Sequence, residues 1–268
     1  MGVACVACAT NLAAQSVPSD RLIRDGDAAA EFNEVGSLIG LWPNLDRDVD
    51  QLFNSFWALK FDGGRDVLVT SSAGFYTEDA TGDTLTITYA TFGIPDDVLV
   101  SSEWVVSELP DSASVMLSST LTVTNNSSVG FSLDAFKYVD VDLVSDPSVL
   151  NPETFDNANF NGSDAIVYSH ALDSRYSAEH TATGFDRWEV DDWLTLRGDV
   201  IRSGDLANRK QFPDTIDGDV ASAFQWQDRP LSPGATESFN SSFVVTIPEP
   251  ASIALLLPAM LTLKRRRA

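Results

Sequence analysis

Cysteine is nearly absent from this chain, which has two among its 268 residues, Cys5 and Cys8. Both lie within residues 1–14, which we expect to be removed as a signal peptide. The mature protein then has no cysteine, which excludes a disulfide framework, thiolate catalysis and a cysteine-ligated metal. Histidine is scarce as well. His170 and His180 stand at a spacing that fits no metal-ligand pattern, so we expect surface or core histidines.

Basic residues are few outside the C-terminus. Of the 17 Lys and Arg, four stand at positions 264–267, and the remaining 13 face 39 Asp and Glu, a balance of −26. Such a surface repels nucleic acid and anionic lipid and attracts cations, so we expect no nucleic-acid partner. The sequence also has neither a nucleophile elbow nor a glycine loop that cradles phosphate.

Alternating hydrophobicity is what the sequence has in abundance. With 44% hydrophobic residues, six Trp and fifteen Phe, the chain is too apolar to be disordered. Residues 84–89 alternate strictly, which places Leu85, Ile87 and Tyr89 inward and threonines outward. Residues 120–124 repeat this pattern. Further strands are expected at residues 67–70, 98–106, 139–143, 165–170, 193–197, 220–227 and 239–247.

Helical patterns are nearly missing. Residues 48–59 are the exception, because their apolar residues, Leu52 and Phe56 among them, fall on one side of a helix. Half-buried strands joined by short Gly, Pro and Asn turns predict an all-β fold, an antiparallel β-sandwich. We expect a single large domain over residues 15–247.

The last 21 residues form a segment of three parts. Pro248, Glu249 and Pro250 interrupt any helix or strand, because proline fixes φ and lacks an N–H. An apolar run follows over residues 251–263, where we expect a short hydrophobic helix. Thirteen helical residues reach about 20 Å, short of the roughly 30 Å hydrocarbon core of a membrane. The segment is therefore marginal as a permanent anchor, and we expect transient attachment, with a buried terminal helix as the alternative. The chain closes on four cations, Lys264, Arg265, Arg266 and Arg267.

This tail resembles a PEP-CTERM sorting signal in its Pro-Glu-Pro-Ala-Ser opening, its leucine run at 255–257 and its basic end. In that family exosortase, a membrane-embedded cysteine transpeptidase-like enzyme, recognises these parts and cuts the tail during export. Here the apolar part is shorter than usual and contains Pro258. The resemblance implies an exported protein of the cell surface or extracellular space. The same kind of tail is also labelled an ice-binding protein C-terminal domain, a label that implies no ice binding.

The N-terminus agrees with export. Residues 2–14 are small and apolar and carry no charge, and polar sequence begins at Gln15. They resemble the second half of a secretory signal peptide, cleaved after Ala14. The basic n-region is missing, which leaves a start upstream of Met1 open. A buried N-terminal strand and a lipoprotein anchored through Cys5 or Cys8 are the alternatives.

Aspartates at short spacing supply the hard oxygen ligands that Ca²⁺ prefers. Asp140 and Asp142 share one face of a predicted strand, and Asp217 and Asp219 lie in a predicted turn. Either pair is a candidate Ca²⁺ site. The alternative is a solvated acidic loop that keeps an edge strand from pairing.

Tryptophans beside carboxylates are candidate sugar contacts, because indole rings stack on sugar rings. Trp188, Trp193 and Trp226 lie in such surroundings, with ordinary core tryptophan as the alternative.

Threonine rows at 84–88 and 120–124 suggest ice binding. Such surfaces need many equivalent strands, however, and outward threonine is simply a good strand residue.

Three functions therefore remain open. We favour an exported, non-catalytic protein of the cell surface or extracellular matrix, associated with exopolysaccharide. The others are a Ca²⁺-dependent adhesion or carbohydrate-binding module and a carboxylate-based, glycosidase-like enzyme. A glycosidase needs only an acid and a base across the sugar, but with 39 acidic residues the sequence nominates no pair. No catalytic residue is predicted.

Overall fold

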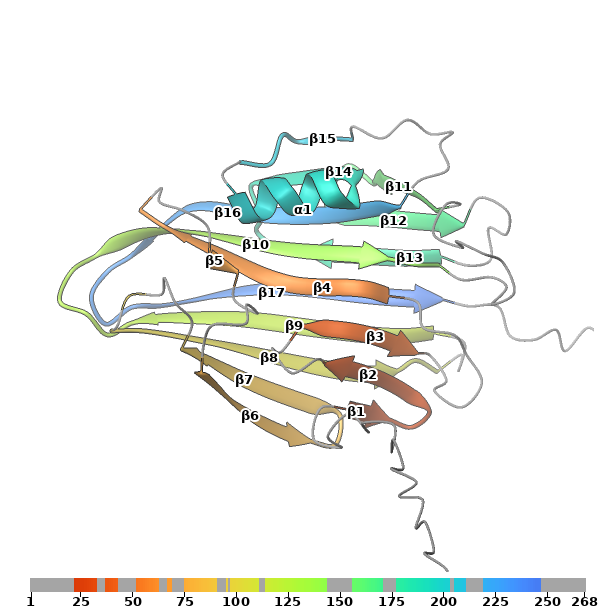
Figure 1. Cartoon of the computed structure of the whole chain (residues 1–268), viewed down its shortest axis with the longest axis horizontal. Coiled ribbons are helices and arrows are strands. Elements are labelled where there is room, and N and C mark those ends of the chain that lie inside the picture. The colour runs from red at the N-terminus through yellow and green to blue at the C-terminus, as the bar shows by residue number, and fades with distance from the viewer. Residues whose placement is uncertain are drawn as a thin grey trace, which may run out of the picture.

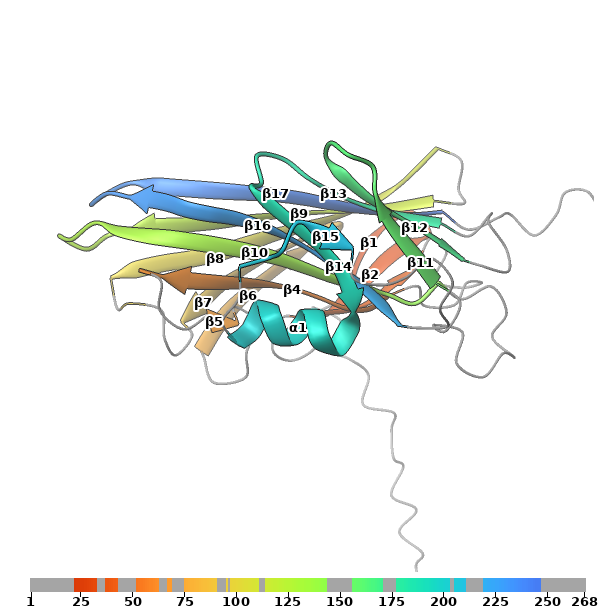
Figure 2. The ribbon, with the colours of Figure 1, turned by 90° about the horizontal axis from the view of Figure 1, so that it is seen from above.

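The computed structural model describes most of the chain between residues 22 and 246. The described residues form two large sheets that pack face to face, with one helix on an outer face (Figures 1 and 2). This arrangement confirms the predicted antiparallel β-sandwich. The described ranges are 22–32, 37–42, 52–62, 67–68, 75–90, 95, 97–110, 114–143, 156–170, 177–202, 205–210 and 219–246.

The first sheet has nine strands, and its described pairings are antiparallel except that of its two last strands. In spatial order the strands are β1 (Leu22–Asp25), β2 (Ala28–Phe32), β3 (Leu38–Trp42), β4 (Leu52–Phe61), β10 (Phe131–Val141), β16 (Val220–Leu231), β14 (Arg187–Asp192) and β15 (Arg209–Lys210), and β5 (Val67–Leu68) pairs with β4.

The second sheet has eight strands, all paired antiparallel. Its strands β7 and β9 confirm the predicted alternation: Leu85, Ile87 and Tyr89 are buried, and the threonines between them are not. In spatial order the strands are β11 (Asp156–Phe160), β12 (Ala165–His170), β13 (Ser177–Ala182), β17 (Thr236–Thr246), β9 (Ser114–Asn125), β8 (Val98–Glu108), β7 (Thr84–Ala90) and β6 (Phe75–Thr81).

Large aromatic side chains from both sheets fill the interface. Trp57 of β4 packs on Trp226 of β16, with ring centroids 5.6 Å apart, and Trp226 packs on Phe239 of β17 at 5.5 Å. Trp104 of β8 is fully buried against Phe32 of β2. Each such side chain contributes roughly 1.5–3 kcal/mol by leaving water. This shared apolar layer holds the two sheets together.

Helix α1 (Trp193–Arg202) lies against the outer face of the nine-stranded sheet (Figure 2). A second apolar cluster lies between this helix and the sheet. Leu196 and Val200 of the helix pack there. The predicted strand at 193–197 is therefore wrong. Asp192 caps the helix, because its Oδ1 accepts the N–H groups of Leu194 and Thr195 at 3.1 and 3.2 Å. The sheet contributes Phe56, Ala58, Phe136, Tyr138, Ala221 and Ala223 to this cluster.

The predicted helix at 48–59 is also wrong, because residues 52–59 belong to strand β4. Both faces of β4 are covered, one by the other sheet and one by α1. Trp57 and Leu59 therefore face one apolar cluster while Phe56 and Ala58 face the other. A strand buried on both faces shows no polar alternation, and its apolar residues imitate a helical pattern.

Asn125 joins the two sheets at one end of the molecule. Its side chain is fully buried and donates to the carbonyl oxygens of Val129 at 2.8 Å and Leu231 at 3.1 Å. Its Oδ1 accepts the Ser127 N–H at 2.9 Å and the Ser127 hydroxyl at 2.6 Å. One side chain thus fixes the turn between β9 and β10 and the end of β16.

Both terminal predictions lie outside the described residues. These are the signal peptide at 1–14 and the sorting tail at 248–268 with its hydrophobic helix. Among the residues that the structure does describe, no helix is long and apolar enough to cross a membrane.

Candidate functional site

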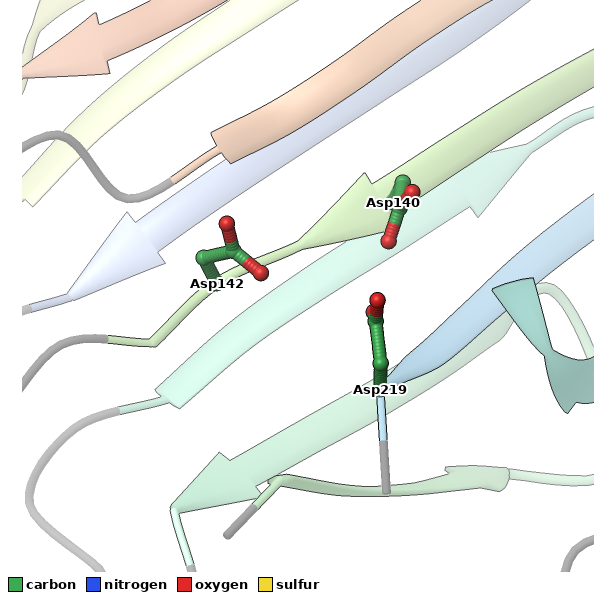
Figure 3. Close-up of side chains that lie close together, drawn as sticks. All are labelled: Asp140, Asp142 and Asp219. Carbon is green, nitrogen blue, oxygen red and sulfur yellow. The ribbon is translucent and has the colours of Figure 1, made fainter. Parts of the chain in front are cut away.

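Three aspartates meet on the outer face of the nine-stranded sheet, beside the start of α1. Asp140 lies at the end of β10, Asp142 follows that strand, and Asp219 directly precedes β16. The pairing of β10 with β16, in which Asp140 is opposite Ala221, brings them together. One carboxylate oxygen from each lies within 4.8 Å of the others, and Figure 3 shows the Asp140 and Asp219 side chains directed toward each other.

Asp140 is the most enclosed of the three, with 1% of its surface exposed. The Tyr138 hydroxyl lies 3.1 Å from its Oδ2 and 3.2 Å from the carbonyl oxygen of Trp193, and donates its one proton between them. Oδ1 of Asp140 has no hydrogen-bond partner within the described part of the chain. A buried acceptor without a donor is costly, so this oxygen requires a proton or a cation.

The electrostatics follow from this enclosure. Burial, and then the negative charges of Asp219 and Asp142, raise the pKa of Asp140 to about 9. Burial and the charge of Asp140 also raise the pKa of Tyr138, which keeps its hydroxyl protonated as a donor. When no cation is present, Asp140 therefore carries a proton at neutral pH.

The two candidate aspartate pairs of the sequence are not two separate groups. Asp140, Asp142 and Asp219 form one cluster, while Asp217 lies outside the described residues. The alternative of a solvated acidic loop at a sheet edge is wrong for Asp140. This residue is buried, and β10 pairs with β4 on one side and β16 on the other.

The three candidate tryptophans do not share a surface. Trp226 is 3% exposed, belongs to the core between the sheets and donates its indole N–H to the Thr183 carbonyl at 2.8 Å. Trp188 packs against the same core and stacks on Phe160 at 4.4 Å. Trp193 is the first residue of α1 and packs against the second apolar cluster, on the other face of the sheet. For Trp226 the core alternative is right, and sugar contact by Trp188 or Trp193 stays a prediction.

His180 is a core histidine, as expected from its sequence context. Its Nδ1 lies 2.7 Å from the Ser222 hydroxyl and its Nε2 lies 3.0 Å from the Ser241 hydroxyl, all between the sheets. Burial, and then the charge of Lys137, hold the pKa of His180 well below 6.5. The side chain of His170 is outside the described residues.

Hydroxyl side chains line the outer face of the eight-stranded sheet. The threonine row of β7 and that of β9 lie on this one face, separated only by β8. Leu99 and Glu103 of β8 stand between the rows, so the hydroxyls do not repeat regularly across the three strands. Cross-strand hydrogen bonds link the hydroxyl and amide groups of Ser114–Thr246 (2.9 Å), Thr120–Asn240 (2.8 Å), Thr122–Ser238 (3.2 Å), Thr124–Thr236 (3.0 Å) and Thr181–Ser242 (2.5 Å).

A groove of about 260 Å³ opens on this face where β9, β17 and β13 lie side by side. We call it the hydroxyl groove. It contains no charged side chain, and its hydroxyl and amide groups can donate and accept hydrogen bonds. Sequence reasoning missed it, because the groove depends on which strands are neighbours. Its lining residues are Ser118, Ser119, Thr120, Thr181, Ala182, Thr183, Asn240, Ser241 and Ser242.

Comparison with known proteins identifies the architecture. No protein-family model and no curated protein matches the sequence. A bacterial glucoamylase complexed with acarbose superposes with a TM-score of 0.54 at 7% identity, over 87% of this chain and 32% of the glucoamylase. A putative aldose 1-epimerase from Escherichia coli K12 superposes with a TM-score of 0.51 at 10% identity, over 84% of this chain and 98% of that protein.

These likenesses concern the fold alone, because the sequence identities are very low. This chain spans about a third of the glucoamylase. The epimerase, in contrast, is matched over nearly its whole length. A chain of this size therefore builds the same two-sheet architecture with a largely different sequence.

Proposed function

We propose that this chain is an exported, non-catalytic protein of the cell surface or extracellular matrix that binds uncharged polysaccharide. The observation that carries the proposal is the hydroxyl groove. Its size, about 260 Å³, is just below the roughly 300 Å³ at which small-molecule pockets begin, which suits one residue of a glycan chain. Its uncharged donors and acceptors match sugar hydroxyls.

The charge of the protein selects among polysaccharides. The formal net charge is −22, so the protein as a whole repels an anionic polymer. An uncharged glycan meets no such barrier. We therefore expect binding to neutral polysaccharides and little binding to uronic-acid or sulfated ones.

The fold likeness supports a carbohydrate-related role. Both solved structures carry names of enzymes that act on sugars, a glucoamylase and an aldose 1-epimerase. A carboxylate-based, carbohydrate-active enzyme is therefore the second candidate, favoured by the proximity of Asp140 and Asp219. Against it, Asp140 is 1% exposed, which keeps a glycosidic oxygen from reaching it.

A pull-down of the full chain on insoluble neutral glucans and mannans tests the proposal. The double variant Thr120→Val with Asn240→Leu removes a hydrogen-bonded pair from the groove and should weaken binding about tenfold. Thr88→Val, on β7 of the same face, is the matched control and should bind like the wild type. Failure of the wild type to bind any neutral polymer contradicts the proposal, and release of reducing sugar favours the enzyme.

Export through an exosortase substrate tail is part of the same proposal. It is supported by the resemblance of residues 248–268 to a PEP-CTERM signal and by the apolar N-terminus. Deleting residues 248–268 and fractionating the cells tests it. We expect the truncated chain to be missorted and unprocessed. Arrival of the truncated protein in the same compartment, equally processed, contradicts the sorting role.

A further inference from the structure

Asp140, Asp142 and Asp219 have the spacing of ligands around one ion. Ca²⁺ binds oxygens at 2.3–2.6 Å, so two ligands of the same ion lie at most about 5 Å apart. The nearest oxygens of the three carboxylates lie within 4.8 Å of one another. Asp140 and Asp142 stand at the end of β10 and Asp219 stands directly before β16, and Figure 3 shows their side chains on one side of the sheet.

The buried oxygen of Asp140 is a second and independent observation. Acidic clusters are common on protein surfaces, where water solvates each carboxylate. Asp140 is 1% exposed, and its Oδ1 has no hydrogen-bond donor in the described part of the chain. Its side chain is directed toward Asp219, which offers another acceptor (Figure 3). Asp140 is buried and Asp219 is half-buried, and two carboxylate oxygens that face each other there require a proton or a cation between them.

We propose that Asp140, Asp142 and Asp219 bind one divalent cation, Ca²⁺ in preference to Mg²⁺. The three side chains are hard oxygen ligands, and no nitrogen or sulfur ligand belongs to the cluster as described, so Zn²⁺ and copper are poor candidates. Three carboxylates are fewer than the six to eight oxygens that Ca²⁺ takes, so water completes the shell. Mg²⁺ demands stricter octahedral geometry than this asymmetric set provides.

The cation also ties elements of the fold together. It joins the end of β10 to the start of β16, which are distant in sequence. The Trp193 N–H donates to the Asp219 carbonyl oxygen at 3.1 Å, and the Tyr138 hydroxyl contacts both Asp140 and the Trp193 carbonyl oxygen. The first residue of α1 is therefore connected to two ligand residues. Ca²⁺ binding should stabilise the docking of α1 as well as the sheet.

The test measures Ca²⁺ binding by the full chain after treatment with a chelator. Thermal unfolding is followed with CaCl₂, with MgCl₂ and with NaCl at equal ionic strength. We expect Ca²⁺ to raise Tm by several degrees and Mg²⁺ to raise it less. Calorimetric titration should give a Kd of about 10⁻⁴ to 10⁻³ M, the range of extracellular Ca²⁺ modules.

Two variants and a matched control assign the effect to the cluster. Asp219→Asn and Asp140→Asn should each weaken Ca²⁺ binding at least about tenfold. In the absence of Ca²⁺, Asp140→Asn should change Tm little, because the protonated Asp140 and an asparagine side chain are both uncharged. Loss of the Ca²⁺ response without loss of stability separates a ligand from a residue that is merely structural. Glu179→Gln, an exposed acid on β13, should leave the Ca²⁺ response unchanged.

Two results overturn the proposal. One is a wild type whose Tm rises equally in CaCl₂ and NaCl. The other is a Ca²⁺ response that persists in both aspartate variants. Neither result bears on the hydroxyl groove, which lies on the other sheet. A failure of the protein to bind polysaccharide, in turn, does not contradict the cation site. The two proposals can therefore be refuted independently.

Discussion

The Nζ atom of Lys137 lies 3.9 Å from the centre of the Trp104 ring, in the middle of the sandwich. Trp57 lies on another side at 5.1 Å, and the amine donates to the Ser55 hydroxyl at 2.8 Å. The side chain is 2% exposed, and burial holds the pKa of Lys137 well below its usual value. The interior of this acidic protein thus contains a basic group that is costly to charge.

Replacing Lys137 by methionine should therefore stabilise the protein by about 1 kcal/mol or more. Methionine has a similar length, contacts aromatic rings favourably and has no charge to desolvate. Urea denaturation at neutral pH measures the change. Lys60→Met is the control, because Lys60 forms ion pairs with Asp134 at 3.5 Å and Asp205 at 3.6 Å, and its loss should destabilise. A less stable Lys137→Met variant would show that the amine is needed in the core.

His180 should make the protein less stable in mild acid. Its pKa in the folded state is held well below 6.5, so below about pH 6.5 the unfolded chain takes up a proton that the folded chain refuses. Stability then falls with decreasing pH, by at most about 1.4 kcal/mol per pH unit. Denaturation profiles of the wild type and His180→Gln between pH 7 and 5 should differ by this slope. Other groups, such as Asp140 with its raised pKa, make stability change with pH in the opposite direction. They are present in both proteins, so their contribution cancels in the difference between the two profiles. If the two proteins lose stability equally between pH 7 and 5, His180 does not cause the loss in acid.

Replacing Asn125 or its neighbour Asn126 by alanine should change the stability of the protein by very different amounts. Asn125→Ala removes the amide that donates to the carbonyl oxygens of Leu231 and Val129, and of these two only the Val129 oxygen keeps the Ser127 hydroxyl as a donor. We expect a loss of about 1–3 kcal/mol in the free energy of unfolding. Asn126 is exposed, and its backbone N–H keeps its bond to the Asp97 carbonyl oxygen when the side chain is shortened. Asn126→Ala should change stability by less than about 0.5 kcal/mol. Equal effects would refute the role given to the Asn125 side chain.

Trp226 and Trp188 provide a further contrast. Trp226→Ala empties a site between Trp57 and Phe239 and should cost about 3–5 kcal/mol. Trp188 is only half-buried, so Trp188→Ala should cost less than Trp226→Ala. It loses packing against the edge of the core and the stacking on Phe160, which contributes about 0.5–1.5 kcal/mol beyond buried area. Chemical denaturation measures both losses. Trp188→Ala should remain folded and bind neutral polysaccharide like the wild type. If this folded variant binds polysaccharide less well, Trp188 contributes to ligand binding after all.

The strands with one open face were predictable from the sequence, and so were parts of β10 and β16, which are buried on both faces, but β4 was not. Residues 84–90 and 114–125 alternate because every second side chain meets water. Strand β4 has apolar neighbours on both faces, so its pattern indicated a helix. Helix α1 was missed in turn, although Asp192 is a suitable N-cap and Leu196 and Val200 have helical spacing.

The aspartate cluster was predictable only in part. Asp140 and Asp142 are close in sequence, and the alternation placed them correctly on one face. Their association with Asp219 requires the pairing of β10 with β16, which no local pattern encodes. The hydroxyl groove has the same origin, because β9, β17 and β13 become neighbours only in the folded sheet.

Helix α1 has a consequence for how this sequence can diverge. The helix packs on the outer face of the nine-stranded sheet over β10 and β16, and the last nine residues of β10 are all buried, as are the first seven of β16. Almost any substitution there meets packed neighbours. In strand β9 of the eight-stranded sheet, nearly every second side chain is only half-buried, so a substitution there meets fewer packed neighbours. Relatives of this protein should therefore retain β10 and β16 while the hydroxyl-bearing face drifts, and under the proposed function the preferred glycan can change while the scaffold stays the same.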